Sequence, residues 1–197
     1  MSRLPPIPYE EWDLDALADA APGMKKPPPV NVLGLFAHHP ALARSFLAYN
    51  GYLTSRASTV DRRTRELVIL RVAWRRRCRY EWAQHTLIAK QAGVTDKEFA
   101  QLRADVATPG PAPEGSVSLL IGAVDELLDD SGLSDQTYQA LAAELDDRQL
   151  MDLVFTIGTY ALLAMAFNTF GLELDPGVSA DDFDAFNPAR PQPQRET

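Results

Sequence analysis

Apolar residues recur with helical spacing along most of this chain, and no segment shows the two-residue alternation of a β-strand. For example, Leu67, Leu70 and Trp74 fall at i, i+3 and i+7, on one side of a helix. Residues 153–167 are apolar almost throughout, which indicates a helix buried in the core or at a subunit interface. The pattern therefore predicts an all-α fold.

Helix start and stop signals divide the pattern into segments. Pro40 suits the first turn of a helix, Ser58 or Thr59 can cap the next one, and Thr95 with Glu98 forms a capping box. The predicted helices cover residues 40–54, a segment containing 66–73, then 78–93 after a break at 76–78, and 95–104, 117–130, 134–144 and 147–170.

Proline content separates the two ends of the chain from its middle. Residues 1–30 carry seven of the prolines and predict an N-terminal arm that lies over the body or a neighbouring subunit, with a short helix possible at 10–20. Residues 31–175 predict one helical domain, within which the prolines and glycines of 109–115 mark a surface loop. Residues 176–197 predict an extended or disordered C-terminal tail.

Charge and composition exclude several classes of protein. A net charge of −8 and a pI near 4.9 argue against binding to nucleic acid, which requires a clustered basic surface. The first residues lack the apolar core of a signal peptide, and the apolar run at 153–167 is shorter than the ~20 residues that span a bilayer. We therefore expect a cytoplasmic protein that binds neither nucleic acid nor membrane.

The candidate chemistry gathers in one stretch of the chain. Cys78, Glu81 and His85 stand at i, i+3 and i+7, which stacks them on one face of a helix, and Glu66 lies twelve positions upstream. A thiol, an imidazole and two carboxylates within reach of one another are the parts of an acid–base or thiol-activating site. We predict these four residues as catalytic.

Each member also has a purely structural interpretation. Cys78, the single cysteine, can be a reactive thiol at a helix start or a small buried hydrophobic residue. His85 can shuttle a proton with Glu81 or Glu66 as its orienting partner, or make a structural hydrogen bond. Glu81 and His85 supply only two good metal ligands, so we expect no metal site and no other cofactor.

Basic and aromatic residues crowd the same segment. Eight arginines lie between positions 62 and 79, where they can either pair at the surface and at subunit contacts or recognise an anionic substrate. Arg71 and Arg79 are the candidates for substrate binding. Tyr80 and Trp82 flank the motif and can pack in the core or stack on a substrate.

Three stretches together resemble the carboxymuconolactone decarboxylase and alkylhydroperoxidase D-like superfamily. They are the run from Arg65 to Ala73, the Cys78-x-Tyr-Glu81-Trp-x-x-His85 motif and the Ala89-x-x-x-Gly93-Val-Thr segment. A weaker similarity extends over residues 115–172. The resemblance implies an all-α, alkylhydroperoxidase D-like domain that assembles into homo-oligomers.

The resemblance also implies two kinds of chemistry. In the alkylhydroperoxidase D branch, a Glu precedes a Cys-x-x-Cys pair and a His, and the second Cys attacks peroxide; Glu66, Cys78 and His85 match, but Glu81 occupies the position of the attacking thiol. In the decarboxylase branch the corresponding helix carries Glu and His at i, i+4, which Glu81 and His85 match.

Three functions follow as hypotheses. The first is a cofactor-free enzyme that uses acid–base chemistry to decarboxylate or isomerise a small, anionic lactone or carboxylic acid. The second is a thiol peroxidase that uses Cys78 with an external resolving thiol. The third is a non-catalytic oligomeric binding protein.

Overall fold

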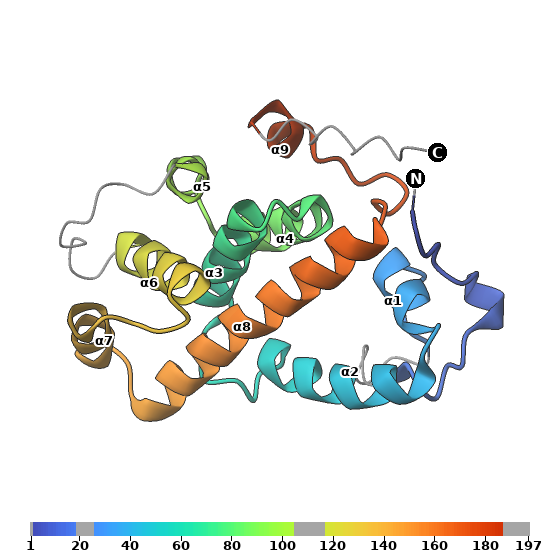
Figure 1. Ribbon diagram of the computed structural model, residues 1–197, viewed down its shortest axis with the longest axis horizontal. Helices are drawn as coiled ribbons and strands as arrows, with labels where there is room; N and C mark the ends of the chain where they lie inside the picture. The colour runs from blue at the N-terminus through green and yellow to red at the C-terminus, as the bar shows by residue number, and fades with distance from the viewer. Residues whose placement is uncertain (1, 19–25, 105–116, 187–197) are drawn as a thin grey trace, which may run out of the picture.

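The computed structural model describes residues 2–18, 26–104 and 117–186. Within these ranges the chain is helical and forms no strand, which confirms the all-α prediction (Figure 1). The α-helices are α1 (Asn31–Phe36), α2 (Pro40–Thr54), α3 (Arg62–Arg75), α4 (Arg79–Gln91), α5 (Asp96–Arg103), α6 (Val117–Asp129), α7 (Asp135–Ala142), α8 (Asp147–Phe170) and α9 (Asp181–Phe186). The predicted loop at 109–115 lies outside the described residues.

Helix α8 is the central element of the fold, and it crosses the molecule diagonally in Figure 1. Its start is fixed by a capping box between Asp146 and Gln149, and its end by Gly171, whose φ of 67° is the left-handed conformation that glycine adopts readily. The predicted bounds, 147–170, are confirmed. Leu153 and Ile157 are buried in the main hydrophobic core, where α8 packs against α3.

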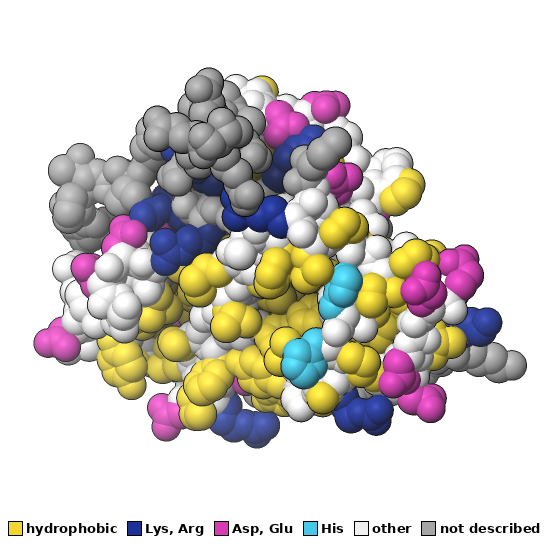
Figure 2. Space-filling view, turned by 45° about the vertical axis from the view of Figure 1, so that its right-hand side comes forward, with side chains coloured by type: hydrophobic (Ala, Val, Ile, Leu, Met, Phe, Trp, Pro, Cys, Tyr) yellow, Lys and Arg dark blue, Asp and Glu magenta, His cyan; other side chains and the backbone are white. Residues whose placement is uncertain are grey.

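By length and composition α8 could cross a bilayer, but just over half of its most apolar window is buried inside the molecule. The exposed side chains of this helix include Met151, Phe155, Leu162 and Met165. Figure 2 shows one face of the molecule, on which hydrophobic side chains gather in a broad patch.

Helices α3 and α4 form a hairpin that carries the candidate catalytic residues. Helix α3 begins at Asp61, whose carboxylate accepts hydrogen bonds from the backbone N–H groups of Arg63 and Thr64, so the cap is Asp61 rather than the predicted Ser58 or Thr59. The predicted break is confirmed: Arg77 has a φ of 52°, and Cys78 precedes the first residue of α4. The turn reverses the chain so that α4 packs against α3.

The shorter helices agree with the capping signals. Thr95 and Glu98 form the predicted capping box of α5, and Ser134 caps α7. Helix α1 was not predicted. Helix α9 lies in the tail that the sequence predicts to be extended, and its Phe183 is buried against Trp74 and Trp82.

The N-terminal segment packs on the body of the same chain. Trp12 and Leu17 are buried with Leu33 of α1 and Leu47 of α2. The helix considered for residues 10–20 is absent over the described part, which contains a 3-10 turn at Tyr9–Glu11 followed by further turns. Prolines shorten regular structure here, and buried aromatic and aliphatic side chains hold the segment in place.

Candidate active site

Glu66 and His85 form the centre of the candidate site. Glu66 projects from α3 and His85 from α4, and the Oε2 atom of Glu66 lies 2.7 Å from Nδ1 of His85. Both side chains are largely buried, since 4% of the Glu66 side chain and 14% of the His85 side chain are exposed. A carboxylate on Nδ1 places the ring proton there and leaves Nε2 as the nitrogen that can exchange a proton with a bound molecule.

The ring of Tyr160 in α8 packs against the imidazole of His85. Its ring meets the His85 ring edge to face, with centroids 5.0 Å apart and planes at 89°. Burial raises the pKa of Tyr160, and the nearby carboxylates of Glu66 and Glu81 raise it further. Tyr160 therefore stays neutral and acts as a rigid wall that fixes the plane of His85.

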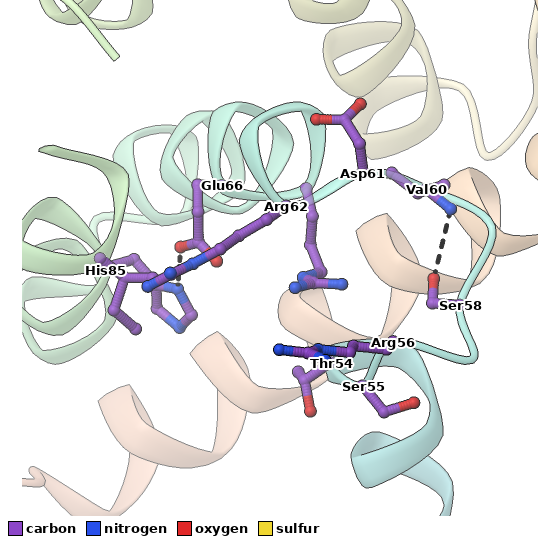
Figure 3. Close-up of a pocket in the computed structure, with 11 residues that line it drawn as sticks. Thr54, Ser55, Arg56, Ser58, Val60, Asp61, Arg62, Glu66 and His85 are labelled. Atoms are coloured by element: carbon purple, nitrogen blue, oxygen red, sulfur yellow. Dashed lines mark hydrogen bonds and ion pairs between the residues drawn. The ribbon is translucent and has the colours of Figure 1, made fainter. Parts of the chain in front are cut away.

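A cavity of about 700 Å³ opens in front of the Glu66–His85 pair. Its wall consists of the segment between α2 and α3, the first turns of α3, and two residues of α4 (Figure 3). The lining residues are Thr54, Ser55, Arg56, Ser58, Val60, Asp61, Arg62, Arg65, Glu66, His85 and Ile88.

Three arginines give this cavity a basic character. Arg56 and Arg62 reach into the space in front of Glu66 and His85, whereas the carboxylate of Asp61 points away from it (Figure 3). Arg65 is anchored by a 3.1 Å hydrogen bond from Nη1 to the carbonyl of Leu53. Guanidinium groups bind carboxylates in a bidentate manner, so the cavity can hold a small anion next to the imidazole.

Asp152 of α8 fastens the segment that forms the outer wall. Its Oδ2 accepts hydrogen bonds from the backbone N–H of Thr59 at 2.7 Å, from the Thr59 hydroxyl at 2.8 Å and from the Ser58 hydroxyl at 3.3 Å. The hydroxyl of Tyr52 donates to the same carboxylate at 3.0 Å. These hydrogen bonds lower the pKa of Asp152 although burial opposes them. Sequence patterns do not indicate this anchor, because its donors lie 93 to 100 positions away along the chain.

Cys78 and Glu81 do not line the cavity. The Cys78 side chain is completely buried in the main core, and burial together with the Glu81 carboxylate raises the pKa of the thiol well above its ordinary value. The structure therefore provides a buried, neutral thiol rather than the exposed, acidic thiol of a reactive cysteine.

Glu81 is buried to the same degree, and neither of its carboxylate oxygens has a hydrogen-bond partner among the described residues. Burial raises the pKa of Glu81 well above its ordinary value, and the neighbouring Cys78 side chain lowers this pKa by a smaller amount. His85 takes its orienting carboxylate from Glu66 on the neighbouring helix, not from Glu81 on its own helix.

The four candidate substrate-binding residues lie outside the cavity, in structural roles. Arg71 is buried and makes a bidentate ion pair with Asp125. Arg79 pairs at the surface with Asp184. The hydroxyl of Tyr80 and the indole N–H of Trp82 donate to Asp175 and Asp182, respectively, which holds the C-terminal segment against α4.

The other two histidines of the described chain contact backbone groups. His39 caps α2, since its Nδ1 accepts a hydrogen bond from the backbone N–H of Leu42, and the Nε2 atom of His38 lies 2.8 Å from the carbonyl of Pro5. The described residues contain no group of three or more His, Cys, Asp or Glu side chains that could hold a metal ion.

Comparison with known proteins identifies the chain's relatives. Residues 40–120 match the pattern of the carboxymuconolactone decarboxylase family. An uncharacterized protein of Bacillus subtilis, YdfG, is 27% identical over 103 residues, which cover 52% of this chain and 70% of that protein.

Two crystal structures share the fold. A protein of unknown function from Agrobacterium tumefaciens, a candidate antioxidant defence protein AhpD, aligns with a TM-score of 0.61 at 18% identity over 71% of this chain and 94% of its own. An uncharacterized peroxidase-related protein from Silicibacter sp. TM1040 aligns with a TM-score of 0.64 at 16% identity over 86% of this chain and 85% of its own. At these identities the two structures show that the helical fold is shared, and the matched family pattern covers residues 40–120 of this chain.

Proposed function

We propose that the protein is an enzyme that decarboxylates or isomerises a small carboxylic acid or lactone by acid–base chemistry, without a cofactor. The observation that supports this is the Glu66–His85 pair at the wall of an arginine-lined cavity. A proton-transfer group and a binding site for an anion stand next to each other there. Neither group alone would indicate a reaction.

His85 and Glu66 have different roles in this reaction. Nε2 of His85 takes a proton from the substrate or returns one to it, while Glu66 holds the Nδ1–H tautomer and stabilises the imidazolium that forms. Isomerisation needs only this exchange, with a proton removed from one carbon and returned to another. The edge-on contact with Tyr160 keeps the ring in the plane that the transfer requires.

Decarboxylation needs one further element, which the arginines supply. When the bond between the carboxyl carbon and the substrate breaks, carbon dioxide leaves and the electron pair passes into an adjacent carbonyl as an enolate. A guanidinium of Arg56, Arg62 or Arg65 can stabilise that negative charge, and protonated His85 then delivers a proton to the carbon. The anionic carboxylate in the ground state is also held by a guanidinium.

A thiol peroxidase is less well supported by the same geometry. A hydroperoxide has to reach a thiolate, but Cys78 is completely buried and its pKa is raised. A purely non-catalytic role is also less well supported, because an open cavity meets the proton-transfer pair.

The test uses a panel of small carboxylic acids and lactones, with substrate loss and hydrogen–deuterium exchange at carbon followed by NMR. For any compound that the protein turns over, His85→Gln and Glu66→Gln should each lower kcat/KM by about 100-fold or more. Arg56→Gln should act mainly on KM. Unchanged turnover in His85→Gln would overturn the proposal.

Two control variants separate the competing mechanisms. Cys78→Ser should leave the acid–base activity within a few fold of the wild type, since the thiol does not reach the cavity. Hydrogen peroxide consumption in the presence of dithiothreitol, abolished in Cys78→Ser and accompanied by a dimedone adduct on Cys78, would instead support the peroxidase.

A further inference from the structure

Arg65 is a buried cation without a counter-ion in the described part of the chain. The residue is 7% exposed, and its guanidinium makes one hydrogen bond there, 3.1 Å from Nη1 to the carbonyl of Leu53. No described carboxylate lies within ion-pair distance of it. A buried charge without a partner strongly destabilises the folded state, so this guanidinium points to an anion supplied by a ligand.

The other two arginines of the cavity also make no ion pair with a described residue. They are Arg56 and Arg62, and both are exposed where they line the cavity. Several arginines outside the cavity do have carboxylate partners: Arg63 pairs with Glu98, Arg71 and Arg75 with Asp125, and Arg79 with Asp184. The chain thus leaves three guanidinium groups of one cavity without a counter-ion.

The three guanidinium groups reach the cavity from two of its walls. Arg62 and Arg65 stand at i and i+3 on α3, where side chains are neighbours, so one compact group can contact both. Arg62 is also tethered to α4, since its Nη2 donates to Oε1 of Gln91 at 3.2 Å. Arg56 enters from the segment between α2 and α3 (Figure 3).

The hydroxyl groups that line the cavity have already donated their protons within the chain. Thr54 donates to the carbonyl of Asn50 at 3.0 Å, Ser55 to the carbonyl of Tyr52 at 2.9 Å, and Ser58 to Asp152 at 3.3 Å. The side-chain donors left for a ligand beside these arginines are therefore guanidinium N–H groups. They suit a ligand group that has several acceptor oxygens and more than one negative charge.

The carboxylates around the cavity do not balance the arginines. Glu66 is paired with His85 at 2.7 Å, and Asp61 points away from the cavity and caps α3. A single carboxylate on the ligand would compensate only one of the three guanidinium charges. A phosphate monoester carries about −1.5 to −2 at pH 7, and its three terminal oxygens accept bidentate hydrogen bonds from guanidinium groups.

We propose that the substrate carries a phosphate group, which Arg56, Arg62 and Arg65 bind while the reacting carbon lies at Nε2 of His85. This inference rests on the proposed function and narrows its substrate to a phosphorylated carboxylic acid or the lactone of one. The phosphate contributes binding energy and takes no part in the reaction. Each guanidinium has five N–H groups, so an arginine beside the imidazole can donate to the phosphate and to the reacting group.

The net charge of the chain indicates a small molecule rather than a phosphate polymer. At −8 the protein as a whole repels a nucleic acid, and the unpaired arginines are confined to a cavity rather than spread over a basic surface. A small phosphorylated molecule needs only the local positive charge of the cavity.

Titration calorimetry at neutral pH tests the binding group without a reaction, with methyl phosphate, acetate and malonate as probes. Methyl phosphate should bind at least about 10-fold more tightly than either carboxylic acid. Malonate or acetate binding as tightly as methyl phosphate would assign the site to carboxylates and overturn the inference.

Variants of the arginines locate the phosphate site. Arg65→Gln and Arg62→Gln should each weaken methyl phosphate binding by about 10-fold or more. Arg62 is exposed, so its variant keeps the test valid if Arg65→Gln does not fold. Arg44→Gln is the matched control, because it removes the same charge from an exposed position of α2 outside the cavity lining. An equal loss of binding in Arg44→Gln would contradict the proposed site.

Turnover distinguishes a phosphate group on the substrate from free inorganic phosphate. Phosphorylated acids and lactones should have kcat/KM values at least about 100-fold above those of the same compounds without phosphate, and inorganic phosphate should inhibit competitively. Equal turnover of the two sets would overturn the inference. Activation of the unphosphorylated compounds by inorganic phosphate would also overturn it, because the phosphate would then be a separate ligand.

His85→Gln separates this inference from the proposed function. It should bind methyl phosphate within a few fold of the wild type and lose turnover, since the imidazole moves protons and the arginines hold the phosphate. Arginine-dependent phosphate binding with turnover independent of His85 would refute the proposed function alone. Turnover of unphosphorylated compounds that needs His85, in a protein that does not bind methyl phosphate, would refute the phosphate site alone.

Discussion

At the residue scale, Glu81 is a carboxyl group held where its ionised form is least stable. Burial raises the pKa of Glu81, so the folded chain still holds the proton at pH values just above the ordinary pKa of about 4.3, where the unfolded chain releases it. The unfolded state thus binds fewer protons over this range, and the free energy of unfolding falls as the pH rises.

Replacing Glu81 by an apolar residue should remove this fall in the free energy of unfolding. We expect Glu81→Leu to be more stable than the wild type at pH 7, with a difference that grows, by at most about 1.4 kcal/mol per pH unit, as the pH rises from the ordinary glutamate pKa toward the raised pKa of the folded chain. Urea denaturation at a series of pH values measures it. Parallel pH profiles for the two proteins would show that Glu81 ionises in the folded state.

The same residue shows what spacing along one helix could and could not predict. The i, i+4 relation of Glu81 and His85 correctly places both on α4, but two carboxylates were within reach of the imidazole. The choice between them depends on how α3 packs against α4, and that packing brings Glu66 to 2.7 Å from His85. A contact between helices leaves no mark in the periodicity of either one.

At the element scale, most helices with a side-chain cap were predictable, although the cap of α3 is Asp61 rather than Ser58 or Thr59, and short helices held by tertiary contacts were not. The capping boxes of α5 and α8 are local, so their starts could be identified from sequence. Helices α1 and α9 have six residues each, too few to be stable alone. Helix α9 depends on Phe183, which packs on two tryptophans from other parts of the chain.

The segment between α2 and α3 has no regular structure and depends on its anchor to α8. Asp152→Asn should replace an acceptor by a donor that faces the Thr59 N–H, and we expect a loss of about 1–3 kcal/mol in the free energy of unfolding. Amide hydrogen exchange over residues 55–60 should speed up as this wall of the cavity loosens.

The pH dependence of this anchor has the opposite sign to that of Glu81. Because the pKa of Asp152 is lowered in the folded chain, its contribution to the free energy of unfolding is present above the ordinary aspartate pKa and is lost as the pH falls through the folded pKa.

Asp147→Asn is the control for the hydrogen-exchange experiment, since Asp147 is exposed at the start of the same helix. Equal exchange in the two variants would show that Asp152 does not hold the segment.

At the scale of the whole molecule, Arg71 connects three helices, although the sequence predicts it to bind substrate. Arg71 of α3 donates from Nε and Nη2 to Asp125 of α6, at 2.8 and 2.6 Å. Its Nη1 donates to the carbonyls of Leu102 and Ala104, both at 2.7 Å, at the end of α5. The Arg71 side chain is buried, and a buried cation without a partner strongly destabilises the folded state.

Replacing only one member of the Arg71–Asp125 pair should therefore lower the free energy of unfolding more than replacing both members. We expect Asp125→Ala to lower the free energy of unfolding by about 3–5 kcal/mol, because it leaves the buried guanidinium without its counter-ion. The double variant Arg71→Met, Asp125→Leu should recover much of that loss, since apolar side chains of similar volume replace both charges. Urea denaturation of the two variants measures the difference. If the double variant were as unstable as Asp125→Ala, the cost would lie in lost packing between α3 and α6 rather than in the unpaired charge.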